Sequence, residues 1–535
     1  MPLKPHAVLL ALAGSFFILE AQAQTNPALR WQHLDMQADG VPGISADRAY
    51  RELLKDRQPT PVLVAVIDSG IDSTHEDLKP MLWLNPREIG GNGVDDDKNG
   101  YVDDRRGWSF LGNKSGQNIT AETIEDTRLY ARLKPLYNGK KRPKKPGQQA
   151  EYDLYQRVKA SYEQKRKEAE QQYEELSRNY ILNRDLFAKM KAELGVTRLD
   201  TATLRRAAAA STETSKTAGR VNGFLRRNGY PDTEASLEAL SKYMASAKDK
   251  LDTHLNPAFN PRGLVGDDPN NLSERLYGNA DIQGPDASHG THVAGIIGAD
   301  RANQRGLEGI AGPWVRIMGV RSTPNGDERD KDVANAIRYA VDNGAQIINM
   351  SFGKSFSPDK AAVDAALQYA DQKNVLVIHS AGNSNQNLDS IPDFPSPRYL
   401  SGQEIPNMLT VGASGRHNTL ELAAPFSNYG KTMVDVFAPG VEIYSSTPGN
   451  GYAKKSGTSM AAPVVAGMAA VLKAYFPQLT AGQLKQLIMQ SAVPYHTQVY
   501  RPGTREPMDF ANLSKTGGIV NLYEAVKLAQ AGGGK

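Results

Sequence analysis

The chain has 535 residues, and 40% of them are hydrophobic, so it is long enough to bury a large core. Its 63 Lys and Arg stand against 59 Asp and Glu, and the resulting formal net charge of +4 gives no argument for nucleic-acid binding. The sequence contains no cysteine, which excludes disulfides and a lipid-attachment cysteine within it.

The first residues have the pattern of a cleavable export signal. Lys4 precedes an apolar run over 7–19, and Ala21-Gln22-Ala23 fits the small-x-small cleavage rule. The alternative is a membrane anchor, for which the apolar run is short. We therefore expect a signal peptide over 1–23, cut after Ala23. We also expect a secreted or periplasmic protein without stable membrane insertion.

The first chemistry-bearing residue follows a predicted buried strand. Residues 62–67 are all apolar, which is typical of a strand that is covered on both faces. The run ends in Asp68-Ser69-Gly70. Asp68 thus stands at the carboxyl end of a parallel strand, where open α/β sheets place their sites.

An acidic stretch over 92–104 resembles the start of a calcium-binding loop. Gly100 stands at the sharp turn, and Arg106 occupies the place of the final bidentate Glu, so we expect a variant of that loop. The alternative is a solvated acidic turn. Calcium is favoured because five Asp in so short a stretch repel one another without a cation. The candidate ligands are Asp95, Asp97, Asn99, Tyr101 and Asp103.

A long insertion over 113–266 is rich in Lys, Arg, Glu, Gln, Ala and Tyr. Residues 133–146 are basic and Pro-rich, which predicts a loop. Apolar and Tyr residues recur at spacings of three, four and seven over 155–180, which predicts an amphipathic helix. Further helices are expected over 199–209 and 234–255. A spacer, a lid over the cleft, an inhibitory segment and a partner-docking arm remain open as roles.

Two more blocks follow the insertion. In the first, His289 precedes a helix of small and apolar residues that can pack tightly on a sheet. In the second, an apolar strand from residue 375 runs into Ala381-Gly382-Asn383. Between the two blocks, a strand, a helix and a strand alternate over 314–350, which predicts a parallel sheet with right-handed crossovers.

The last block is Gly457-Thr458-Ser459-Met460-Ala461-Ala462-Pro463. Ser459 is flanked by small residues and opens an apolar helix, so its hydroxyl can be exposed. The first backbone N–H groups of that helix lack helical partners and favour negative charge nearby. The block therefore predicts an exposed nucleophile beside an anion-stabilising helix start.

Asp-Ser-Gly, His-Gly-Thr-His, Ala-Gly-Asn and Gly-Thr-Ser-Met-Ala-Ala-Pro, in this order, resemble the subtilisin family of serine proteases. The resemblance implies an α/β fold in three layers, a mostly parallel sheet with helices on both faces, and an added helical subdomain. One departure is Val464, where the family usually has His, and we expect only a packing change. The predicted domains are the signal peptide over 1–23, the catalytic parts over 24–112 and 267–528, the insertion over 113–266, and a disordered tail over 529–535.

The resemblance also implies roles for individual residues. Ser459 is the nucleophile, His289 its base, and Asp68 the residue that orients the imidazole. The Asn383 side chain and the Ser459 backbone N–H stabilise the oxyanion. The substrate-binding residues are Ser351, Phe352, Gly353 and Gly382, with Phe352 as an apolar wall. His292 and His379 are expected to be structural.

These roles predict a secreted serine endopeptidase that cleaves polypeptides through an acyl-enzyme, with no cofactor needed for the chemistry. The alternative is an exported, non-catalytic binding or scaffold protein whose helical insertion serves as a docking arm. The presence of all four chemistry-bearing residues favours the enzyme, because a vestigial site has no physical reason to keep Asp68, His289, Asn383 and Ser459.

Overall fold

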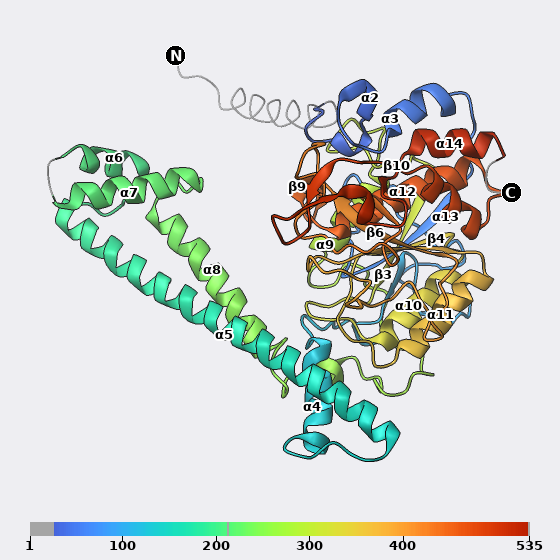
Figure 1. The fold of residues 1–535 in the computed structure, drawn as a ribbon, viewed down its shortest axis with the longest axis horizontal. Coiled ribbons are helices and arrows are strands. Elements are labelled where there is room, and N and C mark those ends of the chain that lie inside the picture. The colour runs from blue at the N-terminus through green and yellow to red at the C-terminus, as the bar shows by residue number, and fades with distance from the viewer. Residues whose placement is uncertain (1–25, 211–212, 533–535) are drawn as a thin grey trace. The chain divides into compact units, whose positions relative to one another are not determined.

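The computed structural model describes residues 26–210 and 213–532, so the predicted signal peptide lies outside the described residues. The chain divides into two compact units (Figure 1). One unit extends to Thr120 and resumes at Pro261, and the other comprises Ala121–Asn260. The second range falls inside the insertion expected over 113–266.

The first unit is built on a nine-stranded sheet in the order β10-β13-β7-β6-β5-β4-β1-β3-β2. Its neighbouring strands run parallel, except for β10 and β13 at one edge. Two antiparallel pairs, β8 with β9 and β11 with β12, lie outside this sheet. The strands of the large sheet are β1 Val62–Asp68, β2 Gly107–Ser109, β3 Val315–Arg321, β4 Ile347–Met350, β5 Leu376–Ser380, β6 Met408–Ser414, β7 Val436–Pro439, β10 Val493–Pro494 and β13 Gly518–Ile519. The two pairs are β8 Ile443–Thr447 with β9 Gly451–Lys455, and β11 Gln498–Tyr500 with β12 Pro507–Asp509.

Helices cover both faces of the large sheet, as the ribbon shows (Figure 1). Along β1, Val64 and Val66 point into the core shared with α9 (Ser288–Gly298) and α12 (Thr458–Tyr475). Ala65 and Ile67 point into the opposite core, shared with α10 (Asp330–Asp342) and α11 (Lys360–Gln372). Since successive strand residues face opposite sides, covering both faces requires an uninterrupted apolar run. The three-layer α/β fold predicted from the sequence is confirmed.

One helix of the first unit is both long and strongly apolar. Within the described residues, α12 alone has the length and apolar composition of a membrane span, but 89% of its apolar window is buried in the unit. It is therefore the central core helix. The helices are α2 Met36–Asp39, α3 Ala46–Ala49, α9 Ser288–Gly298, α10 Asp330–Asp342, α11 Lys360–Gln372, α12 Thr458–Tyr475, α13 Ala481–Gln490 and α14 Leu522–Gln530.

The last helix differs from the expected disordered tail over 529–535. Asn521 caps α14 by accepting the Glu524 N–H, and Leu522 and Val526 are buried one turn apart. This cap and this apolar stripe carry the helix to Gln530. Residues 533–535 lie outside the described part of the chain.

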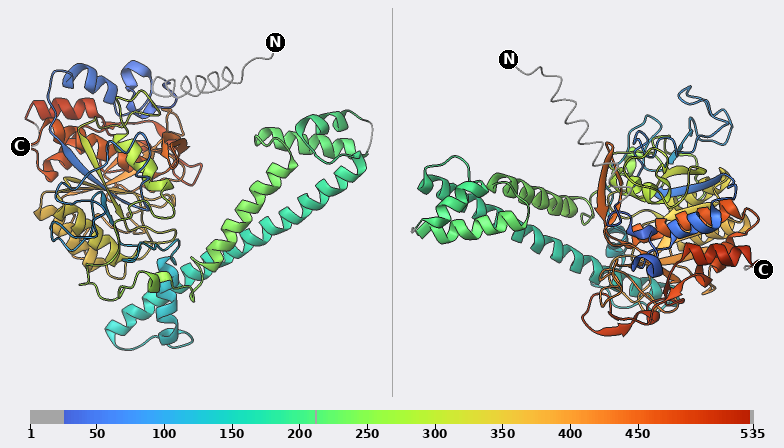
Figure 2. Two further views of the ribbon diagram at one scale, coloured as in Figure 1. Left: turned by 180° about the vertical axis from the view of Figure 1, so that it is seen from behind. Right: turned by 90° about the horizontal axis from the view of Figure 1, so that it is seen from above.

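Helices dominate the second unit, and α5 (Pro146–Leu194) and α8 (Thr233–Asp252) run alongside each other in all three views (Figures 1 and 2). Leu199, Leu204, Ala218 and Leu225 build a separate small core where α6 and α7 meet. Asp200 and Asp232 cap α6 and α8 by accepting backbone N–H groups. The helices are α4 Glu125–Tyr137, α5 Pro146–Leu194, α6 Thr201–Ala209, α7 Glu213–Arg227 and α8 Thr233–Asp252.

The predicted loop over 133–146 is wrong at its start, because α4 continues to Tyr137 with Pro135 in its last turn. Leu129, Leu133 and Tyr137 are buried at helical spacing, and this apolar stripe outweighs the missing N–H of one proline. Helix α7 was not expected at all.

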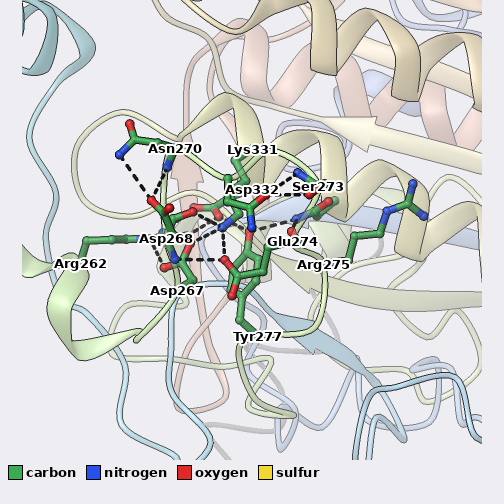
Figure 3. A network of polar contacts seen from close by, with 12 residues as sticks. Arg262, Asp267, Asp268, Asn270, Ser273, Glu274, Arg275, Tyr277, Lys331 and Asp332 are labelled. Atoms are coloured by element: carbon green, nitrogen blue, oxygen red, sulfur yellow. Dashed lines mark hydrogen bonds and ion pairs between the residues drawn. The ribbon is translucent and has the colours of Figure 1, made fainter.

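Where the chain re-enters the first unit, a buried network of charges ties it to α10 (Figure 3). The Arg262 guanidinium donates to both oxygens of Asp332 at 2.7 Å and to Asp267 at 2.6 Å. Lys331 also pairs with Asp267, and the Tyr277 hydroxyl donates to Asp332 at 2.6 Å. Removing one partner from such a buried network costs about 3–5 kcal/mol. The network therefore fixes the segment that leads to His289.

Candidate active site

Asp68 and His289 meet at the carboxyl end of the central strand. The structure places His289 Nδ1 2.8 Å from Asp68 Oδ1, and the same oxygen accepts the Ser69 N–H at 2.7 Å. Asp68 ends β1, which has β3 on one side and β4 on the other, so it lies where the order of the strands reverses. This is the position at which open parallel sheets form a crevice.

The close contact between α9 and the end of β1 depends on Gly290. A Cβ at this position would lie 2.3 Å from the Gly70 carbonyl oxygen and 3.1 Å from Asp68 Oδ1. Any larger residue would push the helix away from the strand, and the imidazole with it. The His-Gly pair seen in the sequence thus has a steric reason.

The pKa of His289 is raised above its ordinary value of 6.5. Burial alone would lower this pKa, but the charge of Asp68 and the hydrogen bond to it outweigh burial. Lys455 opposes the rise from nearby, where its ammonium donates to the Ser288 carbonyl at 2.8 Å. Asp68 therefore stabilises the protonated form of the imidazole.

Ser459 is the second residue of α12 and is only partly buried. Its hydroxyl donates to the Ser351 carbonyl at 3.1 Å, and the Ser351 hydroxyl donates back to the Ser459 carbonyl at 3.0 Å. Ser351 and His289 line the same cavity. The start of α12 is therefore fixed beside the end of β4, on the rim that carries Asp68 and His289.

Thr458 orients the Asn383 side chain. The backbone N–H and the hydroxyl of Thr458 both donate to Asn383 Oδ1, at 2.8 and 3.0 Å. The amide nitrogen of Asn383 therefore points the other way. A Cβ on Gly457 would lie 3.5 Å from that nitrogen and 3.6 Å from the Ser459 N, so both donors border one small space. Sequence reasoning quoted Thr458 but missed this role.

The expected substrate-binding residues lie on the two segments that follow β4 and β5. Ser351 is buried, Phe352 is partly buried, and Gly353 is exposed. His379 Nε2 lies 2.8 Å from the Phe352 carbonyl oxygen, and burial lowers the pKa of His379 to about 4. This neutral histidine therefore holds the backbone of the Ser351–Gly353 segment. Gly382 continues β5 toward Asn383.

His292 was expected to be structural, and Val464 was expected to change only the packing. His292 is fully buried in α9, with Nε2 3.0 Å from the Ala453 carbonyl oxygen. Burial lowers the pKa of His292 to about 3, so it stays neutral. Val464 is fully buried in the core around α12, where a methyl-bearing side chain packs. Both residues contribute packing to the buried interior of the first unit.

The acidic loop brings together only part of the predicted calcium ligands. One carboxylate oxygen each from Glu88, Asp95 and Asp97 lies within 4.8 Å of the others. Asp103 does not join them, because its oxygens accept the N–H groups of residues 91–93 at 2.7–3.1 Å. Asn99 Oδ1 accepts the Tyr101 N–H at 2.8 Å.

Glu88 was missed by sequence reasoning, since it lies outside the loop spacing. It is 7% exposed, and Oε2 has no hydrogen-bond partner among the described residues. An unsatisfied buried carboxylate oxygen beside two further carboxylates fits a hard cation such as Ca²⁺. Arg87 also reaches this group, at 3.0 Å from Asp97.

Comparison with known proteins gives the chain a family context. The sequence profile of the Subtilase family matches residues 60–519. The chain is 44% identical to the "Thermophilic serine proteinase" of Bacillus sp. (strain AK1) over 35% of its own length and 42% of that protein. It is 39% identical to "Thermitase" of Thermoactinomyces vulgaris, over 34% and 60%. It is 36% identical to "Subtilisin Savinase" of Lederbergia lenta, over 40% and 74%. The chain spans about half the length of most curated relatives that it matches.

Proposed function

The chain belongs to the subtilase family, and from this membership and the site geometry we propose that it is a secreted serine endopeptidase acting on polypeptides. The observation that carries the proposal is the 2.8 Å contact between His289 and Asp68 on the rim where α12 presents Ser459. A carboxylate, an imidazole and a hydroxyl at the end of a parallel sheet are the groups that acyl transfer needs.

The proposed reaction begins when the Ser459 hydroxyl turns from the Ser351 carbonyl toward His289 Nε2. His289 takes the hydroxyl proton while the serine oxygen attacks the scissile carbonyl carbon. Asp68 holds Nδ1–H and stabilises the imidazolium. His289 then gives its proton to the leaving amine, and the acyl-enzyme remains on Ser459. Water hydrolyses the acyl-enzyme by the same proton transfers in reverse order.

The negative charge of the tetrahedral intermediate develops on the former carbonyl oxygen. We assign its stabilisation to the Asn383 amide nitrogen and the Ser459 N–H, which border the space beside Gly457. The dipole of α12 adds to this effect because Ser459 lies in its first turn. Fixed donors of this kind are worth about 10²–10³ in rate, a magnitude measured on subtilisin itself.

An extended peptide can pair as an added strand with the Ser351–Gly353 segment, of which Gly353 is exposed. Such pairing gives affinity through main-chain hydrogen bonds and leaves selectivity to the side-chain pockets. The buried hydrogen bond between His379 and the Phe352 carbonyl keeps this segment in place. We therefore assign polypeptide binding to this segment, with Gly382 on the opposite side.

Hydrolysis of casein by the purified protein and by its Ser459→Ala variant tests the proposal. We expect the wild type to release peptides and the variant to lose at least about 10³-fold in rate, since the nucleophile is removed. Equal melting temperatures show that the variant is folded. Equal casein hydrolysis by the two proteins would overturn the assignment of Ser459.

We also propose a structural calcium ion in the acidic loop, held by Asp95, Asp97 and Glu88. The proposed peptide hydrolysis does not use this ion. Bound calcium would neutralise the three carboxylates and pin the 88–100 segment to the unit. The supporting observation is the buried Glu88 Oε2 that lacks a hydrogen-bond partner among the described residues.

A further inference from the structure

The first unit contains a cavity of about 760 Å³ that the proposed reaction does not use. Its walls come from three stretches of the chain, which lie within 415–425 after β6, at 441–442 after β7, and at 500–505 in the β11–β12 hairpin. The cavity that Asp68 and His289 line is a different one. A volume of about 300–1,000 Å³ is typical of sites that bind small organic molecules.

Backbone hydrogen bonds hold the hairpin against the segment after β6. The Tyr500 N–H donates to the Leu420 carbonyl at 2.8 Å, and the Gly503 N–H donates to the Pro425 carbonyl at 2.9 Å. Because these bonds fix two of the walls relative to each other, the cavity is formed before any ligand binds.

Part of the wall is apolar or aromatic, and Trp31, Leu420, Val441 and Tyr500 contribute to it. The Trp31 indole N–H donates to the Val441 carbonyl at 3.1 Å, so this polar group is already satisfied. Leu420 and Tyr500 are 41% and 36% exposed. A molecule bound in the cavity would therefore cover apolar surface that solvent contacts in its absence, which favours binding.

Three arginines, Arg416, Arg501 and Arg505, line the same cavity. The Nε atoms of Arg416 and Arg501 are buried and have no hydrogen-bond partner among the described residues. Arg501 pairs with Glu506 through another nitrogen, whereas Arg416 and Arg505 form no ion pair with any described residue. A buried N–H of a charged group is costly without an acceptor, and an anion in the cavity would supply one.

Two carboxylates, Glu421 and Glu442, also line the cavity. Glu442 pairs with Lys454 at 3.4 Å, and Glu421 is exposed to solvent. The two arginines without a described ion pair, Arg416 and Arg505, therefore face one carboxylate that is not paired with a lysine. The cavity keeps a positive charge, which favours an anionic ligand.

The wall that Glu442 forms is bonded to the block that carries the proposed nucleophile. The Glu442 N–H donates to Ser456 Oγ at 2.8 Å, and the Gly457 N–H donates to the Gly440 carbonyl at 2.8 Å. Cleavage at Ser459 would release a peptide whose new end is a carboxylate. The proposed reaction therefore produces anions of the class that this cavity fits, at a segment bonded to its wall.

We propose that this cavity binds the carboxylate end of a peptide whose last residue is apolar or aromatic. The choice of a peptide as the ligand rests on the peptidase function proposed above. Arg416 and Arg505 hold the carboxylate by charge-assisted hydrogen bonds, and the last side chain packs against Leu420 and Tyr500. An inorganic anion satisfies the arginines but leaves the apolar wall uncovered, so it binds more weakly.

Calorimetric titration of N-acetyl-Ala-Phe into the Ser459→Ala protein, which cleaves no peptide, tests the proposal. We expect binding that is at least about tenfold tighter than that of the C-terminal amide, which lacks the charge. Arg416→Met and Arg505→Met, each added to Ser459→Ala, should weaken binding at least about tenfold. Arg226→Met, which removes an exposed arginine from α7, is the matched control and should leave the affinity unchanged. Equal melting temperatures show that each variant is folded.

Inorganic phosphate is the comparison ligand. If phosphate binds as tightly as N-acetyl-Ala-Phe, the cavity is a simple anion site and the peptide proposal is wrong. Binding of N-acetyl-Ala-Phe that both Arg416→Met and Arg505→Met leave unchanged would also overturn it, because the ligand then lies elsewhere.

Failure of this proposal is distinguishable from failure of the peptidase function, because binding is measured without cleavage. If a fluorophosphonate labels Ser459 in the wild type but N-acetyl-Ala-Phe does not bind to Ser459→Ala, the cavity proposal is wrong and the peptidase function stands. A folded wild type that takes up no label and cleaves no casein overturns the peptidase function, and with it the choice of a peptide as the ligand.

Discussion

At the residue scale, three histidines near the site differ in what surrounds them. His289 faces Asp68, whereas His292 and His379 are buried against backbone carbonyls. We expect the ring protons of His289 to titrate with a midpoint above 6.5 in an NMR titration. His292 and His379, with pKa values of about 3 and 4, should show no titration between pH 5 and pH 8 and serve as internal controls.

The raised pKa of His289 sets the pH dependence of activity. Since His289 must be neutral to accept the serine proton, kcat/KM should rise with pH through its pKa, with a midpoint above 6.5. In Asp68→Asn the charge that raises the pKa is gone, so the NMR midpoint should move to lower pH. A midpoint that is the same in both proteins would contradict the pairing of Asp68 with His289.

Thr458 gives a positioning test. Thr458→Val keeps the volume and the backbone donor but removes the hydroxyl that donates to Asn383 Oδ1 at 3.0 Å. Losing one of two bonds that orient the amide should lower kcat about 10-fold with little change in KM. Thr497→Val, which removes an exposed hydroxyl bonded to Asn418, is the matched control. An unchanged kcat would show that the Thr458 hydroxyl does not position Asn383.

Individual residues of the site were predictable where a motif carries them. Asp68, His289, Asn383 and Ser459 stand in short blocks with a chemical reason for each residue type. The Thr458 hydroxyl reaches Asn383 only through the tertiary fold, at 3.0 Å from its Oδ1. This positioning role could not be read from spacing.

At the element scale, the acidic loop should couple calcium to stability. EDTA should lower the melting temperature of the calcium-loaded protein by about 3 °C, because a ligand that binds only the folded state stabilises it. Glu88→Gln removes the charge of the buried ligand and should shrink this difference. Glu506→Gln, at an exposed carboxylate, should leave the effect of EDTA on the melting temperature unchanged. If EDTA leaves the melting temperature of the wild type unchanged, the calcium proposal is wrong.

The strands and most core helices could be predicted because their apolar periodicity is strong. The run over 62–67 becomes β1, and the helix expected within 314–350 becomes α10. The calcium loop was only partly predictable, because spacing could not show that Asp103 binds the N–H groups of 91–93. Glu88 reaches the loop through tertiary packing, which spacing does not encode.

At the scale of the whole molecule, the role of the helical unit Ala121–Asn260 can be tested by deleting it. Its chain leaves and returns at one place, since the Ile124 N–H donates to the His254 carbonyl at 3.1 Å. Each unit has its own hydrophobic core. Replacing residues 121–260 by a short Gly-Ser linker should therefore leave the first unit folded, with kcat/KM on small peptide p-nitroanilides within about threefold of the wild type.

The rate of casein hydrolysis by the protein without residues 121–260 distinguishes the roles left open for that unit. A lid or an inhibitory segment predicts faster casein hydrolysis after deletion with unchanged small-peptide rates. A docking arm predicts slower hydrolysis only for the partner that it binds. A rate on casein equal to that of the wild type would exclude the lid from the roles left open. Loss of folding in the deleted protein, measured by its melting temperature, would contradict the independence of the first unit.

The central claim is that Ser459, His289 and Asp68 act as one nucleophilic site. Labelling with a fluorophosphonate, followed by peptide mapping by mass spectrometry, tests it most directly. We predict a single adduct on Ser459 in the folded wild type, no adduct in Ser459→Ala, and labelling at least about 100-fold slower in His289→Ala. A folded wild type that takes up no label, or a His289→Ala variant that labels at the wild-type rate, would contradict the account.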